Sequence, residues 1–183
     1  MKQTDLLLYN NSPYHPGAGA VKRVLWYYVN CLIFKSSLFP FYWIKNFLLK
    51  LFGAKIGNEV EIKPCVNIKY PWHLTIGNEV WVGENVWMDS LVRIIICNNV
   101  CISQGAMLLT GSHNYKKSTF NLITGIITIE DGVWIGAGAI INQGVTCGNH
   151  SVVTAGSIVT KNMEPYSIYQ GNPAEKIRER VID

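Results

Sequence analysis

The sequence IGNEV occurs twice, at residues 56–60 and at residues 76–80, and these two copies open a six-residue repeat. From them, an apolar residue recurs at every sixth position in groups of three. Four residues after each of these positions the chain has Val, Ala or Ser, with Trp72 and Met163 as the exceptions. Because two separate constraints share one period, the repeat is a structural signal. The fifteen apolar positions are Ile56, Ile62, Ile68, Ile76, Val82, Met88, Ile96, Ile102, Leu108, Ile129, Ile135, Ile141, Cys147, Val153 and Val159.

A period of six predicts short strands joined by corners. An α-helix, with about 3.6 residues per turn, would lose this phase within two turns, and the many Val, Ile, Gly and Asn residues disfavour long helices. Three hexads close one triangular coil, in which the aliphatic residue points inward and the small residue four positions later fills the narrow space beside it. Gly or Asn occupies many corners, where a positive φ is needed. Stacked coils then bury a continuous core. The sequence therefore predicts an all-β fold, a parallel β-helix of about five coils that begin near Ile56, Ile76, Ile96, Ile129 and Cys147.

The repeat has one large interruption, between Leu108 and Ile129. Twenty residues stand where regular spacing needs five, so about fifteen are extruded as a loop, whereas only two-residue slips precede Ile76 and Ile96. Long loops in compact domains are usually functional. This loop, within residues 109–128, contains the sequence GSHNY at positions 111–115 and is the first candidate for chemistry.

The chain divides into three regions: an N-terminal helical capping segment (1–55), the β-helix domain (56–164) and a C-terminal extension (165–183). Residues 18–52 have apolar residues at helical spacing, and Pro40 separates two amphipathic helices. We expect these helices to cover the exposed first coil, since terminal repeats need caps. An alternative is peripheral contact with an anionic membrane through exposed aromatic residues and the basic residues Lys22, Arg23, Lys35, Lys45 and Lys50.

At the other end, a short charged helix is expected from Ala174 to about Val181. Pro173 stands at the favourable first helical position, and the sequence AEKIRERV is rich in helix formers. This helix would close the last coil.

Composition narrows the class of protein. With 49% apolar and 15% charged residues the chain is not disordered, and a net charge of +4 is too weak to predict nucleic-acid binding. The apolar run from Val24 to Phe34 is too short to span a bilayer. Five cysteines without a CxxC pair, and no signal-peptide pattern near Met1, favour a cytoplasmic protein. The thiols of Cys97 and Cys101 fall inside regular repeat units, so no metal site is expected.

The motifs together resemble the hexapeptide-repeat acyltransferases, and among them most of all the colanic acid biosynthesis acetyltransferases. The resemblance covers nearly the whole chain and rests on the hexads and on YNNSPYHPGAG (9–19), FGAKIG (52–57), TGSHNYKK (110–117), DGVWIGAGAIINQGV (131–145), VTAGSIVTK (153–161) and YQGNPAEKIRER (169–180). It implies a left-handed β-helix, a homotrimer, and transfer of an acetyl group from acetyl-CoA to a sugar hydroxyl.

The resemblance also implies roles for single residues. His113 matches the catalytic histidine, a side chain suited to act as general base near neutral pH. The backbone N–H of Ala137 matches the donor that holds the thioester oxygen. Trp134 matches the aromatic residue along the pantetheine arm of coenzyme A. The other three histidines, His15, His73 and His150, are interpreted as ordinary surface or capping residues.

Further positions match the ends of the two substrates. Ala155 and Gly156 match small residues whose backbone meets the pantetheine amides, and Thr160 and Lys161 match the segment near the nucleotide. Arg178, with Lys176 and Arg180, is expected to supply charge to the phosphates. On the acceptor side, Asp89 matches a residue that contacts sugar hydroxyls, and Asn114 and Tyr115 are expected to shape the pocket.

Three alternatives compete with this function. A zinc enzyme on the same fold needs three protein ligands, and no second histidine accompanies His113 in its loop. A non-catalytic repeat scaffold or binding module is the alternative from another class, since a fold alone never fixes function. A longer acyl group or an amine acceptor fits the same motifs. The sequence does not identify the acceptor; an exopolysaccharide or its lipid-linked sugar intermediate is the best guess.

Overall fold

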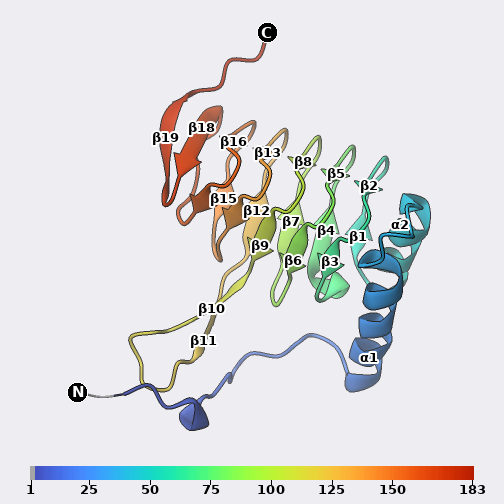
Figure 1. Ribbon diagram of the computed structural model, residues 1–183, viewed down its shortest axis with the longest axis vertical. Helices are drawn as coiled ribbons and strands as arrows, with labels where there is room; N and C mark the ends of the chain where they lie inside the picture. The colour runs from blue at the N-terminus through green and yellow to red at the C-terminus, as the bar shows by residue number, and fades with distance from the viewer. Residues whose placement is uncertain (1–2) are drawn as a thin grey trace.

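The computed structural model describes residues 3–183 and has a prism of three parallel sheets with helices at one end (Figure 1). Each coil contributes one strand to each face, and we call the faces sheets A, B and C. Sheet A contains β1 (Lys55–Ile56), β4 (Leu74–Ile76), β7 (Ile94–Ile96), β12 (Ile127–Ile129) and β15 (Thr146–Cys147). Sheet B contains β2 (Glu61–Ile62), β5 (Trp81–Val82), β8 (Cys101–Ile102), β13 (Trp134–Ile135), β16 (Val152–Val153), β18 (Ser167–Gly171) and β19 (Ala174–Glu179). Sheet C contains β3 (Asn67–Ile68), β6 (Trp87–Asp89), β9 (Met107–Leu109), β14 (Ile140–Ile141) and β17 (Ile158–Val159).

The repeat positions are in register from coil to coil. Along sheet A, Ile56 pairs with Ile76, Ile76 with Ile96, Ile96 with Ile129 and Ile129 with Cys147. All the repeat positions are buried except Ile56, which is half-buried. Five coils are complete, and a sixth begins where Met163 bridges to Cys147 and β18 pairs with β16. The predicted β-helix is therefore confirmed.

The smaller inward residues differ from the sequence pattern at one corner. Val92 and Ser112 have the expected residue type, but they are only half-buried and do not fill the wall. The buried positions there are instead the first residues of β4, β7 and β12, which are Leu74, Ile94 and Ile127. The reason is that extra residues at the corner between sheets C and A displace the six-residue pattern there. The inward-facing pattern resumes two residues before the last residue of each of these strands.

All the insertions lie at this C–A corner. They comprise residues 69–73, which include the 3-10 turn η3 (Pro71–His73), residues 90–93, and the long loop after β9. The loop contains an antiparallel hairpin of β10 (Gly111–His113) and β11 (Leu122–Thr124), which extends away from the prism on the side opposite sheet B (Figure 1).

The corner between sheets B and C is tight at every coil. A Cβ atom on Gly83 would lie 2.5 Å from the backbone N of Gln104, and one on Gly136 would lie 2.6 Å from the backbone N of Ala155. These glycines are required by close approach of the next coil.

The N-terminal helices cover the first coil. They are α1 (Ala20–Val29), the π-helix η2 (Asn30–Phe34) and α2 (Tyr42–Leu51), and a 3-10 turn, η1 (Leu6–Leu8), precedes them. Trp26 Nε1 donates to the carbonyl of Ile68 at 2.8 Å, and the side chain of Asn30 accepts from Ile68 N at 3.2 Å. These contacts satisfy backbone groups that no earlier coil can pair.

Lys45 is a buried cation in the same cap. Its side chain is 0% exposed, and Nζ donates to the carbonyls of Ile62 at 3.2 Å and Lys63 at 2.8 Å. Asn46 Nδ2 adds a hydrogen bond of 2.7 Å to the carbonyl of Val60. Burial lowers the pKa of Lys45, because removal from water disfavours the charged form.

The prediction of a C-terminal helix is wrong. Residues 174–179 form β19, which pairs antiparallel with β18, and Asn172 and Pro173 make the turn between them. The open edge of sheet B explains the difference. Parallel pairing of β18 with β16 continues that sheet, and pairing with β19 then overrides the helical propensity of the sequence.

Among residues 3–183, no helix is both long and apolar enough to cross a membrane.

Candidate functional site

His113 ends β10 and is held by its own hairpin. Nδ1 lies 2.9 Å from the carbonyl oxygen of Phe120, and the two rings stack with centroids 4.4 Å apart and planes at 5°. Because a carbonyl oxygen only accepts, Nδ1 carries the hydrogen in this contact, and the neutral ring keeps its lone pair on Nε2. The ring is thus oriented with one nitrogen able to accept a proton.

Asp89 lies beside the base of the hairpin. Asp89 on β6 pairs with Leu109 on β9. A Cβ atom added to Gly111, the first residue of β10, would lie 3.6 Å from Asp89 Oδ2. Side chains two apart in a strand share one side, so His113 projects from the same side of β10, roughly 7 Å further along. The structure thus brings Asp89 and His113 to one side of the hairpin.

A lysine balances the charge of the Asp89 carboxylate, but not all of its hydrogen-bond acceptor sites are used. Lys69 Nζ lies 3.0 Å from Oδ1, and the Asp89 side chain is 13% exposed. Oδ1 is buried, and the angles of this ion pair do not make it a hydrogen bond, so Oδ1 has no hydrogen-bond donor within residues 3–183. The carboxylate can therefore accept hydrogen bonds from hydroxyl groups of a ligand.

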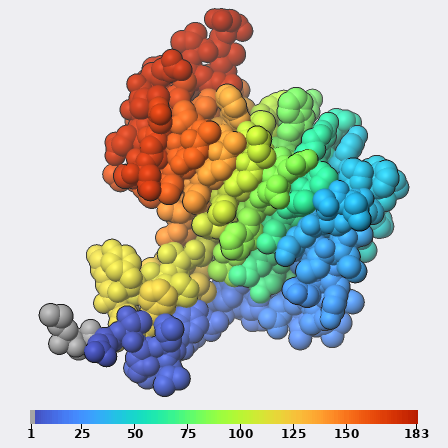
Figure 2. Space-filling view, viewed as in Figure 1, coloured from blue at the N-terminus to red at the C-terminus, as the bar shows by residue number. Residues whose placement is uncertain are grey.

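The N-terminal segment before α1 also reaches this corner, which the sequence interpretation missed. Asp5 N donates to the carbonyl of Ser118 at 2.8 Å, and the Tyr9 ring lies 5.7 Å from the His113 ring. Figure 2 shows the blue N-terminal residues packed against the yellow loop. The only hint in the sequence was the motif YNNSPYHPGAG at residues 9–19, which resembled the family without indicating a role.

Tyr14 is the most distinctive residue of that segment. Its hydroxyl is buried and has no hydrogen-bond partner among residues 3–183. Burial raises the pKa of Tyr14 above its ordinary value of 10.0, and the neighbouring groups Tyr70 and Asp89 act in the same direction. Tyr14 therefore stays protonated at neutral pH and offers a hydroxyl donor near Asp89.

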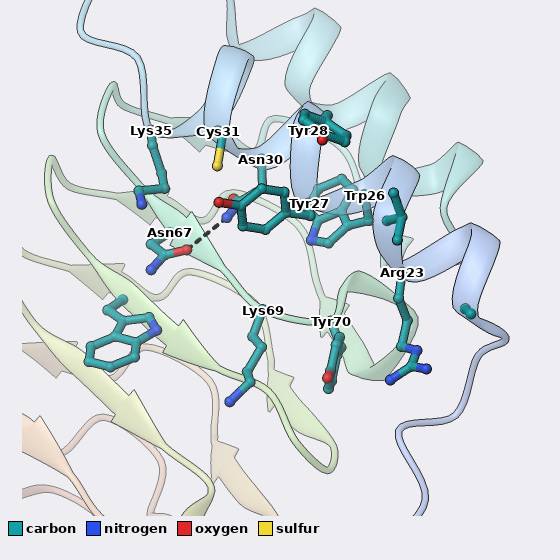
Figure 3. A pocket seen from close by; sticks show the side chains of 13 residues that line it. Arg23, Trp26, Tyr27, Tyr28, Asn30, Cys31, Lys35, Asn67, Lys69 and Tyr70 are labelled. Carbon is teal, nitrogen blue, oxygen red and sulfur yellow. Dashed lines mark hydrogen bonds between the residues drawn. The ribbon is translucent and has the colours of Figure 1, made fainter.

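A cavity of about 680 Å³ adjoins this corner, between α1 and sheet C (Figure 3). Three cations line it, namely Arg23, Lys35 and Lys69, and its lining residues include no Asp or Glu. Tyr27 and Tyr70 contribute aromatic walls, and a hydrogen bond of 2.8 Å joins two further lining residues, Asn30 and Asn67 (Figure 3). The cavity is suited to an anionic group.

The predicted cofactor residues lie on a different part of the prism. Trp134 projects from sheet B, is 48% exposed and donates through Nε1 to Ser103 Oγ at 3.0 Å. Ala137 and Ala155 occupy successive turns of the B–C corner, and Gly156, with φ +69°, follows there. Within residues 3–183, neither Ala137 N–H nor Ala155 N–H has a hydrogen-bond partner.

The same hydrogen-bond pattern recurs at successive turns of the B–C corner. The carbonyl of Ala137 accepts from Gly156 N, as that of Gln104 accepts from Gly138 N and that of Glu84 from Gly105 N. The B–C corner thus presents stacked turns whose second residue donates no backbone hydrogen bond within residues 3–183.

The residues expected near the nucleotide are more scattered than the sequence suggested. Thr160 and Lys161 are exposed, but they follow β17 and lie at the C–A corner, not with Ala155. Lys176 pairs with Glu164 at 2.7 Å and Glu179 at 2.6 Å. The Arg180 guanidinium donates to the carbonyls of Gly132 and His150, at 3.0 Å each. Arg178 is exposed on β19 and has no ion-pair partner in the part of the chain described.

Asn114 and Tyr115 belong to the tip of the hairpin. Asn114 Oδ1 accepts from Lys116 N at 3.1 Å, and its backbone N donates to the carbonyl of Asn121 at 2.8 Å. Tyr115 is 77% exposed. Asn114 thus fixes the turn, and within residues 3–183 neither side chain forms a hydrogen bond with Asp89.

The thiols lie in or near the wall. Burial raises the pKa of Cys147 to about 12 and also raises those of Cys97 and Cys101. Residues 3–183 contain no group of three His, Cys, Asp or Glu residues placed to hold a metal ion.

No family model matches the chain. Similarity to single proteins is nevertheless extensive. WcaF of Escherichia coli (strain K12), whose assignment as a colanic acid biosynthesis acetyltransferase is itself inferred, is 42% identical over 165 residues, which are 90% of this chain and 91% of WcaF. The galactoside O-acetyltransferase of the same strain is 34% identical over 135 residues, 72% of this chain and 66% of that enzyme.

The fold has a similar solved counterpart. The hexapeptide-repeat acetyltransferase VCA0836 of Vibrio cholerae O1 biovar eltor, crystallised with acetyl coenzyme A, has a TM-score of 0.82 and 25% identity, covering 96% of this chain and 97% of that one. The architecture is thus the left-handed β-helix of such enzymes.

The β-helix of hexads is the architecture of a class of acetyltransferases, and this chain belongs to the hexapeptide-repeat acetyltransferase family. Acetyl coenzyme A is the acetyl donor of this class, as in the VCA0836 complex. Within the family, the chain is similar to WcaF over nearly its whole length.

Proposed function

We propose that the chain is an O-acetyltransferase that moves an acetyl group from acetyl-CoA to a hydroxyl of a sugar or exopolysaccharide precursor, with His113 as general base. The main supporting observation is the fixed orientation of the His113 imidazole. Its Nδ1–H donates to the carbonyl oxygen of Phe120, which leaves Nε2 to accept a proton. A sugar acceptor is supported by Asp89 and Tyr14, which together offer a hydroxyl acceptor and a hydroxyl donor near one another. It is also the acceptor class of galactoside O-acetyltransferase, a relative.

The transfer needs no covalent enzyme intermediate. His113 Nε2 takes the proton of the acceptor hydroxyl while the hydroxyl oxygen attacks the thioester carbon. The thioester oxygen becomes an oxyanion, and the N–H of Ala137 donates to it. The C–S bond then breaks, and the imidazolium returns its proton to the leaving sulfur, which releases coenzyme A as a free thiol and the acceptor as an acetyl ester.

The site is completed by a second copy of the chain. His113 leaves the prism at the C–A corner, whereas Ala137 and Ala155 lie at the B–C corner, so one full face of the prism, roughly 16 Å wide, separates them within one chain. A homotrimer, in which the hairpin of one copy faces the B–C corner of the next, removes this separation. In that arrangement Trp134, Ala155 and Gly156 of one copy hold coenzyme A together with Thr160 and Lys161, which lie at the C–A corner of the neighbouring copy. Arg178 on β19 is the proposed partner of its phosphates.

The test is release of free thiol from acetyl-CoA in the presence of a panel of sugars and nucleotide sugars. We expect at least one acceptor to be turned over, and His113→Ala to lower kcat about a thousandfold, the typical contribution of a general base. His150→Asn, a histidine removed from a distant corner, is the matched control and should keep wild-type activity. An unchanged rate in His113→Ala would refute the mechanism, and no coenzyme A binding at all would favour a non-catalytic scaffold.

Mixed oligomers test the shared site. His113→Ala and Ala155→Arg should each be inactive alone, the first for lack of a base and the second because a long side chain blocks the B–C corner. Co-expressed, they should regain part of the wild-type rate, since some sites then combine an intact hairpin with an intact corner. No recovery in oligomers shown to contain both chains would mean that each site lies within one chain.

A further inference from the structure

Positive charge is concentrated in the N-terminal cap. Residues 6–58 contain no Asp or Glu, and they carry six of the sixteen Lys and Arg residues of the chain. The remaining residues have ten cations against all twelve carboxylates, so the cap has a formal charge of +6 and the rest of the chain −2. The six cations are Lys22, Arg23, Lys35, Lys45, Lys50 and Lys55.

The same segment exposes large apolar side chains. While Trp26, Phe34 and Leu49 pack against the first coil, the opposite sides of α1, η2 and α2 are left uncovered. We call this the outer face. An exposed apolar patch beside cations marks an interaction surface. Its most exposed members are Val21 (75%), Leu32 (69%), Leu38 (88%), Trp43 (64%), Phe47 (63%) and Leu51 (66%).

We propose that the outer face docks on the surface of an anionic lipid bilayer. The positive charge of the cap favours a membrane over a second copy of the chain. Phosphate headgroups attract the cap, whereas the outer face of a second copy carries the same positive charge and would be repelled. Helices with an apolar side and flanking cations lie in the plane of the interface, with the apolar residues among the upper acyl chains. The helices of the cap are of this kind and, within the described residues, too short to span.

The cavity between α1 and sheet C supports this orientation. Its rim includes Val24, Tyr27 and Tyr28 of α1, which are all more than half exposed, so it opens beside the apolar helix surface (Figure 3). Two of its cations, Arg23 and Lys35, have no ion-pair partner within residues 3–183. They therefore lie where a lipid headgroup phosphate would meet the cap.

Membrane docking is separate from the proposed function, because it needs neither acetyl-CoA nor His113. Where both hold, the acceptor is a sugar carried by a lipid in the same membrane, since Lys69 belongs both to the cavity and to the ion pair with Asp89.

The test is co-sedimentation of the full chain with vesicles, without acetyl-CoA. We expect binding to vesicles of phosphatidylglycerol and phosphatidylcholine, little binding to phosphatidylcholine alone, and weaker binding in high salt. Trp43→Ser should weaken partitioning about tenfold by removing an apolar anchor. Trp81→Ser is the matched control: Trp81 is 61% exposed, but it projects from sheet B, and its loss should leave binding unchanged.

Charge is tested by a second pair of variants. Arg23→Gln with Lys35→Gln should weaken binding to anionic vesicles at least about tenfold, whereas Lys116→Gln with Lys117→Gln, exposed cations of the loop, should have little effect. All variants should keep the melting temperature of the wild type. Absence of binding to anionic vesicles, or equal losses in variant and control, would overturn the proposal. A smaller oligomer for Trp43→Ser would also overturn it, by showing that a second copy covers the outer face.

Discussion

The B–C and C–A corners join the same kind of strands but differ in regularity. Every B–C turn is tight, with the next coil packed directly on Gly83 and Gly136. Three C–A turns carry insertions, and the largest bears His113. Insertions are tolerated because Ile94 and Ile127 restore the register before each strand of sheet A ends. A repeat therefore keeps its core and admits a long loop at one corner, while the turns at the other corner stay uniform.

The largest effect is expected where the tight corner is broken. In Gly83→Ala the new methyl group would meet the backbone N of Gln104 at 2.5 Å, and backbone cannot move aside as a side chain can. We expect a loss of about 3 kcal/mol in the free energy of unfolding, measured by thermal or chemical denaturation. Gly19→Ala is the control, since its added methyl group would have no neighbour within 4 Å in the irregular N-terminal segment. Equal stability of both variants would contradict the close packing of coils at the B–C corner.

The next effect sharpens the role of the C–A corner. Asp89→Asn keeps the shape of the side chain but removes the charge that pairs with Lys69 and that we propose accepts hydrogen bonds from sugar hydroxyl groups. We expect kcat/KM for the sugar acceptor to fall about thirtyfold, near 2 kcal/mol, with the KM for acetyl-CoA unchanged. Glu79→Gln, the same chemical change at an exposed corner between sheets A and B, should leave both constants alone. A parallel rise in the KM for acetyl-CoA would instead assign Asp89 to the cofactor.

The smallest effect concerns the cap. Lys45→Met leaves the carbonyls of Ile62 and Lys63 without a donor, but it also removes a buried charge. These opposite contributions should leave a net loss of about 1 kcal/mol in the free energy of unfolding at pH 7. Lys50→Met, an exposed change on the same helix, should be neutral.

Lys45 also predicts a pH dependence. Its folded pKa is lowered below the ordinary value of 10.5, so between the two pKa values the unfolded chain binds more protons. The cost of the buried charge is present in full below the folded pKa and is relieved as pH rises towards 10.5. Relative to Lys45→Met, the wild type should therefore gain stability as pH rises from 7 towards about 10, measured by denaturation at each pH. A constant difference would contradict the lowered pKa.

Most of the β-helix could be predicted from sequence because its period is local. Positions six residues apart specify which side chains point inward, and this holds for every coil from Ile56 to Val159. The prediction failed at Val92, Ser112 and residues 174–179, where the outcome depends on which neighbouring coil or sheet edge is available. Of the site, the loop of His113 and the position of Asp89 could be inferred, whereas Tyr9, Tyr14 and Lys69 could not, because no periodicity relates them.

By itself, the sequence determined the fold class, the break after Leu108 and the family, since hexads and motifs are read along the chain. The tertiary structure alone decided which corner each residue occupies. Coiling brings residues far apart in sequence together, as Tyr9 and His113, and it separates residues that motifs had grouped, as His113 and Ala137. The physical reason is that a repeat fixes the burial of each side chain locally, whereas contacts between corners and termini depend on the closed path of the whole chain.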